Sequence, residues 1–329
     1  MRILLTGGAG YIGSHLAVAL LQTDHKVVIV DNFVNSNLDI LEAIEKTSGK
    51  KPDFARVDLL DFVALSQVFD TYKFDCVIHL AGLKSVAESV AEPLHYYENN
   101  IGSTLNLCEA MMVAGVRRCV FSSSATVYDL QSPMPLSERS PLLPQNPYGR
   151  SKLMCEQILE DAVSAHGFSV VSLRYFNPIG SHPTGLLQEK PHGIPNNLLP
   201  YIAQVAGGSR GHLNIFGSDY DTADGTAERD YIHIMDLCAG HLAALEHCIK
   251  NPGYSVFNLG TGHPSSVLEV VRAFETANSL TIPYKLAPRR AGDAASYFAD
   301  PAKAKAILGF ESQHSLVDMC KSYNIDKKS

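Results

Sequence analysis

Short apolar runs alternate with segments of helical periodicity along the first half of the chain. Each run is short and almost wholly apolar, which is typical of parallel strands buried on both faces. We expect strands over residues 2–6, 26–30, 54–58, 75–80, 118–122 and 169–173, and helices over 16–21, 62–72, 94–114 and 148–166. Alternation of this kind predicts an α/β fold with a Rossmann-type doubly wound parallel sheet and right-handed crossovers.

The pattern changes after residue 173, where a loop rich in Gly, Pro and His occupies residues 179–195. Shorter elements follow: helices over 197–206, 235–248 and 267–278, strands over 213–216 and 255–259, and an acidic loop over 219–230. Such a change in composition and in the length of the predicted elements marks a domain boundary. We predict a larger first domain of residues 1–178, which carries the doubly wound sheet, and a smaller C-terminal α/β domain of residues 179–329, with segments near 229–250 crossing back to the first domain.

Composition agrees with a two-domain fold and limits the partners and the cellular compartment to be expected. With 329 residues and 46% hydrophobic residues, the chain can form two globular domains. Its net charge of −7 argues against nucleic acid or a membrane surface as a partner. The seven cysteines form no C-x-x-C motif, and the chain enters a strand at Arg2 without a signal peptide or a bilayer-length apolar run. We therefore expect reduced thiols and a cytoplasmic protein.

The clearest candidate site is the glycine-rich loop after the first strand, Gly-Gly-Ala-Gly-Tyr-Ile-Gly over residues 7–13. Glycines permit the tight turn and let the backbone approach a pyrophosphate, which would lie at the N-terminus of the following helix. Asp31 ends the next strand, where its carboxylate can bind a ribose 2′-hydroxyl and would repel a 2′-phosphate. No Arg or Lys follows directly, so we expect NAD rather than NADP.

A tyrosine and a lysine one helical turn apart form the candidate catalytic pair. Tyr148 and Lys152 would share one face of the helix over 148–166. A free phenol titrates near pH ~10, and an ammonium beside it is expected to lower the pKa of the phenol, as a general base requires. Taken alone, the two residues fit a surface packing pair better than a catalytic pair. His79 continues an apolar strand and is expected to be a core histidine rather than a ligand.

Three serines, at positions 122, 123 and 124, end the fifth predicted strand. Ligands of α/β folds bind beyond the carboxyl ends of the strands, so these hydroxyls are candidate ligand contacts. For Ser123 alone, a turn residue is the simpler interpretation. The thirteen histidines are scattered without metal-ligand spacing, and no metal site is expected.

These motifs together resemble those of the extended short-chain dehydrogenase/reductases over nearly the whole chain. The resemblance is carried by the T-G-G-x-G-Y-I-G-S-H loop, the serine-rich strand end and Tyr-x-x-x-Lys, and by longer segments such as NPYGRSKLMCEQIL and LRYFNPIGSHP. Two positions depart from the usual family pattern: Asp129 stands where Gly is common, and Arg150 replaces a common Lys.

The resemblance implies an epimerase that inverts C4 of UDP-galactose and UDP-glucose through a transient 4-ketose. NAD would take the hydride and return it to the other face, so the cofactor need not leave. Tyr148 would take the O4 proton, Ser124 would bind the same oxygen and offer a proton relay, and Lys152 would bind the nicotinamide ribose and stabilise the phenolate. The resemblance also implies a homodimer formed through the helices over 94–114 and 148–166.

The family pattern assigns further roles residue by residue. Cofactor contacts are expected from Gly7, Gly10, Tyr11, Ile12, Gly13, Asp31, Asn32, Asn35, Ser36, Asp58, Leu59, Leu80, Ala81, Gly82, Lys84, Asn99, Ser122, Tyr148, Lys152 and Phe176. Substrate contacts are expected from Ser124, Tyr148, Asn177, Asn197, Leu198, Asn214, Ile215, Phe216, Arg229, Arg290, Asp293 and Tyr297. Arg229 and Arg290 suit a diphosphate, whereas Arg289 fits a surface salt bridge.

Four other functions fit parts of the sequence. An epimerase of UDP-N-acetylhexosamines would need more room than the bulky Tyr297 is expected to leave. A nucleotide-sugar 4,6-dehydratase would need an Asp-Glu pair after Ser124, where Ala125-Thr126 stands. A net dehydrogenase would consume added NAD stoichiometrically. A non-catalytic NAD-binding scaffold would be expected to lose Tyr148 or Lys152, and both are present.

Overall fold

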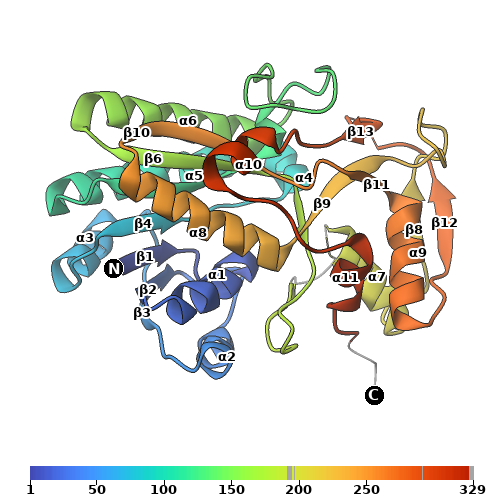
Figure 1. Ribbon diagram of the computed structural model, residues 1–329, viewed down its shortest axis with the longest axis horizontal. Coiled ribbons are helices and arrows are strands. Elements are labelled where there is room, and N and C mark those ends of the chain that lie inside the picture. The colour runs from blue at the N-terminus through green and yellow to red at the C-terminus, as the bar shows by residue number, and fades with distance from the viewer. Residues whose placement is uncertain (191–194, 196, 291, 326–329) are drawn as a thin grey trace.

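A parallel sheet of seven strands forms the centre of the larger part of the molecule (Figure 1). The computed structural model describes residues 1–190, 195, 197–290 and 292–325. β1 (Arg2–Thr6) pairs with β2 (Lys26–Asp31) on one side and with β4 (Cys76–His79) on the other. The order is β10-β6-β5-β4-β1-β2-β3, with β3 (Asp53–Arg56), β5 (Arg118–Ser124), β6 (Ser169–Tyr175) and β10 (Gly253–Leu259) completing the sheet.

Helices cover both faces of this sheet, and successive residues of β1 point to opposite faces, as the strand period of two requires. Ile3 and Leu5 join one apolar core, and Leu4 joins the other. The first core lies under α1 (Tyr11–Gln22), α2 (Asp39–Ser48) and α8 (Ile234–Lys250), which are in front of the sheet in Figure 1. The second lies under α3 (Phe62–Thr71), α5 (Pro93–Ala114) and α6 (Pro147–His166). The expected α/β fold with a doubly wound parallel sheet is confirmed.

The strand order reverses direction between β1 and β4, because the chain winds outward to β3 and then returns to the centre. Adjacent loops diverge at such a switch point and leave a crevice beyond the carboxyl ends of the strands. The glycine-rich loop follows β1 at this position, and residues 80–84 follow β4, before the short helix α4 (Val86–Ala91). The fold therefore brings together two segments to which the sequence assigned cofactor contacts.

A smaller body built on short strands lies beside the carboxyl edge of the sheet, at the right of Figure 1. Its strands are β7 (Asn177–Ile179), β9 (Glu228–His233), β11 (Pro264–Ser266) and β13 (Ser296–Tyr297), with β8 (Leu213–Phe216) paired to β12 (Tyr284–Ala287). Its core packs under α7 (Leu198–Ala206), α9 (Val267–Asn278) and α11 (Leu316–Lys321). α10 (Ala302–Leu308) returns to pack against β10 and α8 of the larger part.

Several elements in the second half of the chain differ from those predicted. β9 begins at Glu228, so the acidic loop expected over 219–230 is too long at its end, because the segment pairs with β7 and β11. α8 covers the large sheet and β10 forms its edge, so the return to the first part extends beyond residue 250. The division into 1–178 and 179–329 stays a prediction.

The cysteines and helices bear on two expectations drawn from composition. All seven cysteines are free thiols, as expected. Across the described part of the chain, no helix is both long and apolar enough to cross a membrane.

Candidate active site

The glycine-rich loop needs glycine for steric reasons at two positions. Gly7 has a φ of 68°, and a Cβ there would lie 2.7 Å from the backbone nitrogen of Ala81. A Cβ on Gly13 would lie 2.2 Å from the carbonyl oxygen of Gly7. The loop enters α1 at Gly10, where none of the described side chains caps the helix and its first turn has no acid. The free N–H groups and the helix dipole suit the pyrophosphate of a dinucleotide.

Asp31 lies beside this loop at the end of β2. Its carboxylate accepts hydrogen bonds from the backbone nitrogens of Ala9 (3.1 Å) and Phe33 (2.8 Å) and from the hydroxyl of Ser36 (3.2 Å). Burial raises the pKa of Asp31, and these hydrogen bonds act in the opposite direction. Asn32 donates to Asp58 across 3.0 Å. Four predicted cofactor residues, at 31, 32, 36 and 58, thus form one polar cluster, whereas Asn35 is exposed on the loop.

The segment after β4 is held against the predicted catalytic helix by Asn100 of α5, a residue that the sequence analysis missed. Its side chain accepts from the Leu83 backbone nitrogen (2.8 Å) and donates to the Leu83 carbonyl (3.1 Å) and to Ser151 (3.0 Å). Asn99 donates to the same Asn100 oxygen (3.0 Å). Asn100 is buried. A buried amide in a helix needs polar partners, and that requirement is the signal that could have identified it.

Lys152 lies four residues after Tyr148 on α6 and is almost wholly buried. Its ammonium donates to the carbonyl oxygen of Ser122 (2.8 Å) and lies 4.9 Å from the centre of the Phe121 ring. Burial lowers the pKa of Lys152 to about 8.

His79 lies between two hydroxyl groups, those of Thr6 (2.8 Å) and Thr104 (3.1 Å). Burial lowers the pKa of His79 to about 3, and the residue is a core histidine, as predicted.

Tyr148 differs from its expected electrostatic behaviour. Burial raises the pKa of its phenol, and a hydrogen bond from Ser124 acts in the opposite direction. We expected Lys152 to lower the pKa of Tyr148. That pKa is raised instead, and among the described residues only Ser124 opposes the effect of burial. The physical reason is desolvation, which disfavours the phenolate, while the Lys152 ammonium is directed to a backbone carbonyl.

A cavity of about 250 Å³ lies beyond the carboxyl ends of β5 and β6. Six residues predicted from the sequence line it: Ser124, Phe176, Asn177, Arg229, Asp293 and Tyr297. The Tyr297 hydroxyl donates to the carbonyl oxygen of Ala125, and its ring centre lies 5.9 Å from that of Phe176. Thr126, Tyr128 and Asn146 also line the cavity, and the sequence analysis assigned them no role.

Ser123 does not face this cavity. It lies buried within β5 and donates to the carboxylate of Glu156 on α6. The same carboxylate holds Arg174 of β6 by two bonds, of 2.6 and 3.0 Å. The simpler interpretation of Ser123 as a turn residue is therefore wrong, because the strand continues through it to Ser124.

Two predicted arginines share the carboxylate of Asp293, which lines the cavity. Arg229 lies 3.5 Å from Asp293, and Arg290 lies 2.8 Å from its other oxygen. Arg290 also lies over the ring of Phe216, 5.1 Å from its centre. Two cations against one anion leave a local excess of positive charge, which suits a diphosphate.

Other predicted substrate residues are distributed around this group. Asn197 at the start of α7 donates to Glu189 (2.7 Å), and Lys84 donates to the same oxygen (2.9 Å). The Glu189 side chain is 8% exposed. It links Lys84, a predicted cofactor residue, with Asn197, a predicted substrate residue. Leu59 and Ile215 pack into apolar cores, so only their backbones can contact a ligand.

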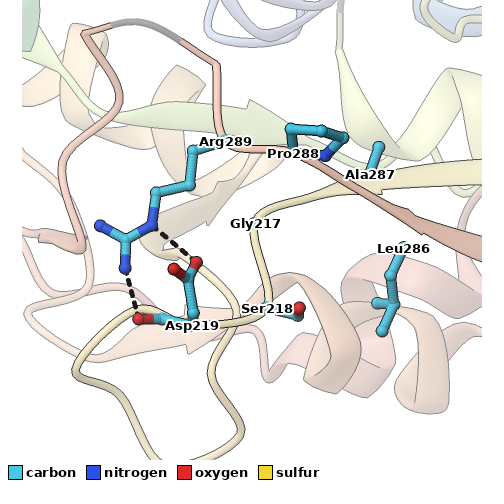
Figure 2. A pocket seen from close by; sticks show the side chains of 7 residues that line it. All are labelled: Gly217, Ser218, Asp219, Leu286, Ala287, Pro288 and Arg289. Atoms are coloured by element: carbon cyan, nitrogen blue, oxygen red, sulfur yellow. Dashed lines mark hydrogen bonds and ion pairs between the residues drawn. The ribbon is translucent and has the colours of Figure 1, made fainter.

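A second hollow, of about 410 Å³, lies at the ends of β8 and β12 (Figure 2). Figure 2 shows the Arg289 guanidinium turned towards Asp219, with Nε 2.7 Å from the carboxylate. The guanidinium carbon also lies 4.1 Å from the centre of the Tyr220 ring. Both charged side chains are well exposed, so Arg289 forms a surface ion pair, as predicted. Among the described residues, none lines both hollows.

Comparison with known proteins gives concordant results. A model described as "NAD dependent epimerase/dehydratase family" matches residues 3–260. The chain is 52% identical to the UDP-glucose 4-epimerase of Bacillus subtilis (strain 168), over 97% of this chain and 95% of that protein. Solved UDP-glucose 4-epimerase structures are also similar. That of Bifidobacterium longum, in complex with NAD+ and UDP, has 47% identity and a TM-score of 0.94, covering 98% of this chain and 96% of that one.

A solved structure of an epimerase named for two sugars is also similar. The UDP-Glc/GlcNAc 4-epimerase of Campylobacter jejuni has 41% identity and a TM-score of 0.85, covering 98% of this chain and 97% of that one.

Proposed function

The chain belongs to the NAD dependent epimerase/dehydratase family, and from this premise we propose that it interconverts UDP-galactose and UDP-glucose by inversion at C4. The observation that carries the proposal is the placement of Ser124, close to Tyr148, in one cavity with the Arg229–Asp293 pair. Ser124, beside the predicted base, then shares one pocket with a site suited to a diphosphate. The identity of 52% to a UDP-glucose 4-epimerase over 97% of the chain supports the same substrates.

The residues of the glycine-rich loop fit NAD, which supplies a hydride acceptor and donor when bound. Gly7 and Gly13 leave room for the backbone to approach the pyrophosphate, and the N-terminus of α1 offers free N–H groups. Asp31 would bind the adenosine ribose and select against a 2′-phosphate.

The chemistry follows from the carbon to be inverted. C4 of the sugar carries no acidic C–H bond, so removal of a bare proton is unfavourable, whereas loss of a hydride gives an ordinary ketone. Tyr148 accepts the O4 proton in that step and returns it after the ketose has turned. Lys152 supplies a buried positive charge beside the reacting groups, and Arg229 and Arg290 hold the diphosphate while the sugar moves.

Two further parts of the proposal concern assembly and compartment. We propose a homodimer through α5 and α6. The support is a set of exposed apolar side chains on these helices: Leu94 and Val113, both 80% exposed, and Leu105 and Met154.

We propose that the protein acts in the cytoplasm, which agrees with its seven free thiols.

The proposed activity is tested by incubating the purified protein with UDP-galactose and no added cofactor. UDP-glucose should form without accumulation of NADH. The Tyr148→Phe variant should be slower by roughly 10²- to 10⁴-fold and should still bind UDP. Stoichiometric NADH would indicate a net dehydrogenase, and NAD binding without turnover would indicate a scaffold.

Substrate range is tested with UDP-N-acetylgalactosamine. The Tyr297 ring is anchored to Ala125 and narrows the cavity, so we expect much slower turnover than with UDP-galactose. Comparable rates with the two substrates would contradict the proposed preference.

A further inference from the structure

The turn that follows β5 fixes the hydroxyl of Ser124 from two directions. The backbone nitrogen of Thr126 donates to the Ser124 oxygen (3.2 Å), and so does the Thr126 hydroxyl (2.9 Å). Ser124 thereby caps the short 3₁₀ turn Ala125–Val127. Thr126 is thus bound to Ser124 through both its backbone and its side chain.

Two neighbouring elements hold this turn in place. The Tyr297 hydroxyl donates to the carbonyl of Ala125. On the other side, α6 packs so closely that a Cβ on Gly149 would lie 2.5 Å from the Thr126 carbonyl oxygen. Gly149 directly follows Tyr148, so the turn and the predicted base are fixed relative to each other by backbone contact. Thr126 therefore has little freedom to release Ser124.

The hydrogen-bonding capacity of a hydroxyl then limits what Ser124 can do. A serine oxygen has two lone pairs and one proton. Both lone pairs accept from Thr126, which leaves the proton as the only group that Ser124 can offer. Ser124 acts to lower the pKa of the Tyr148 phenol, against the effect of burial, as a donor to the phenolate would. A proton relay would need a free lone pair to receive the O4 proton, and none is left.

We propose that Thr126 is a positioning residue that makes Ser124 a hydrogen-bond donor only, so that the O4 proton passes directly to Tyr148. This inference rests on the proposed function and deepens it. In the oxidative step the O4–H bond breaks and the Tyr148 O–H bond forms, and NAD, when bound, would supply the acceptor for the hydride of C4 and its electron pair. The O–H bond of Ser124 stays intact. The reductive step reverses each of these changes on the other face of the ketose.

The first test compares Thr126→Val with Thr126→Ser in the holoenzyme. Valine keeps the branched shape but removes one donor to Ser124, whereas serine keeps that donor. For Thr126→Val, the acidic limb of the kcat/KM profile with UDP-galactose should move to higher pH by roughly half a unit to one unit. Thr126→Ser should keep the wild-type profile. Loss of packing alone would lower the rate without moving the limb, so an unmoved limb in Thr126→Val overturns the inference.

The second test needs no variant. The rate of the wild-type holoenzyme is measured in mixtures of H₂O and D₂O under conditions in which the oxidative step limits turnover. A linear dependence on the deuterium fraction indicates one proton in flight, as direct transfer requires. A curved dependence of the rate on the deuterium fraction, which fits only the transfer of two protons, indicates relay through Ser124 and overturns the inference. A wild-type protein with no UDP-galactose conversion would instead refute the proposed function.

Discussion

Asp31 illustrates how a single side chain can serve the fold and a ligand together. Its two carboxylate oxygens accept hydrogen bonds from Ala9, Phe33 and Ser36. These bonds hold the glycine-rich loop next to the loop that follows β2. These bonds leave lone pairs of a carboxylate free to accept from a ribose hydroxyl. The residue that organises the loop is therefore also the one expected to choose between NAD and NADP.

We predict that Asp31→Asn weakens NAD binding by roughly 10- to 100-fold. The amide loses the charge that strengthens hydrogen bonds to the ribose hydroxyls, each of which contributes about 1.5–3 kcal/mol when its acceptor is charged. Titration of the cofactor-free protein with NAD by calorimetry measures the change. Binding of NADP should improve relative to NAD in the same variant, because a 2′-phosphate no longer meets a carboxylate. An unchanged ratio of the two affinities would contradict the assigned role.

A substitution at Gly13 tests the steric need for glycine in the loop. Gly13→Ala would place a Cβ 2.2 Å from the Gly7 carbonyl, so the backbone must shift. We expect a loss of NAD binding of at least about tenfold, since the loop would no longer follow the pyrophosphate closely. The matched control is Gly211→Ala, where the added Cβ meets no atom within 4 Å. NAD affinity is measured in both variants, and equal values would refute the steric argument.

At the scale of elements, the position of α6 depends on a buried ion pair. Glu156 on α6 and Arg174 on β6 are joined by two bonds, of 2.6 and 3.0 Å, and each side chain is 4% exposed. Arg174 also donates to the Tyr128 hydroxyl (3.1 Å), which in turn donates to Asn258 (2.6 Å) of β10. The helix that carries Tyr148 and Lys152 is thereby tied to two strands of the sheet.

We predict that Glu156→Ala lowers the free energy of unfolding by about 3–5 kcal/mol, because Arg174 is left as an unpaired buried charge. Urea denaturation followed by circular dichroism measures the change. Glu160→Ala, at an exposed position on the same helix, should change it by less than about 0.5 kcal/mol. Replacing both members of the pair with apolar residues should recover much of the loss, and failure to do so would count against a charge-based cause.

For the whole molecule, buried histidines link stability to pH. Burial lowers the pKa of His15, His233 and His241 from 6.5 to about 4, and that of His79 to about 3. In the unfolded chain these groups bind protons more readily than in the folded protein. Their contribution to stability is therefore complete above about pH 6.5 and is lost as the pH falls towards 4.

We predict that the free energy of unfolding decreases steadily between pH 6.5 and pH 4.5, by roughly 1.4 kcal/mol per pH unit for each such histidine. Urea denaturation at several pH values measures the slope. His241→Gln should make the slope shallower, whereas His166→Gln, at an exposed position, should leave it unchanged. A stability that does not vary over this range would contradict the assignment.

Much of the architecture and the candidate site could be predicted from local sequence. The apolar runs gave six strands of the large sheet. For its central strands the reason is that burial on both faces requires continuous apolar sequence, whereas the edge strand β3 is largely exposed. The seventh, β10, was expected as a strand, but no pattern indicated which sheet it joins. Five strands of the smaller body were not predicted: β7, β9, β11, β12 and β13. Of these, β7, β11 and β13 are only two or three residues long and depend on their neighbours for pairing.

The sequence by itself determined the chemistry that is available: the glycines for a tight loop, an acid after β2, and a tyrosine and lysine one turn apart. These follow from residue type and short spacing, which a chain carries locally. Only the tertiary structure decided how those groups behave, because burial and hydrogen-bond geometry arise from segments distant in sequence. Burial raises the pKa of Tyr148, Asn100 holds the loop after β4, and Thr126 occupies both lone pairs of Ser124.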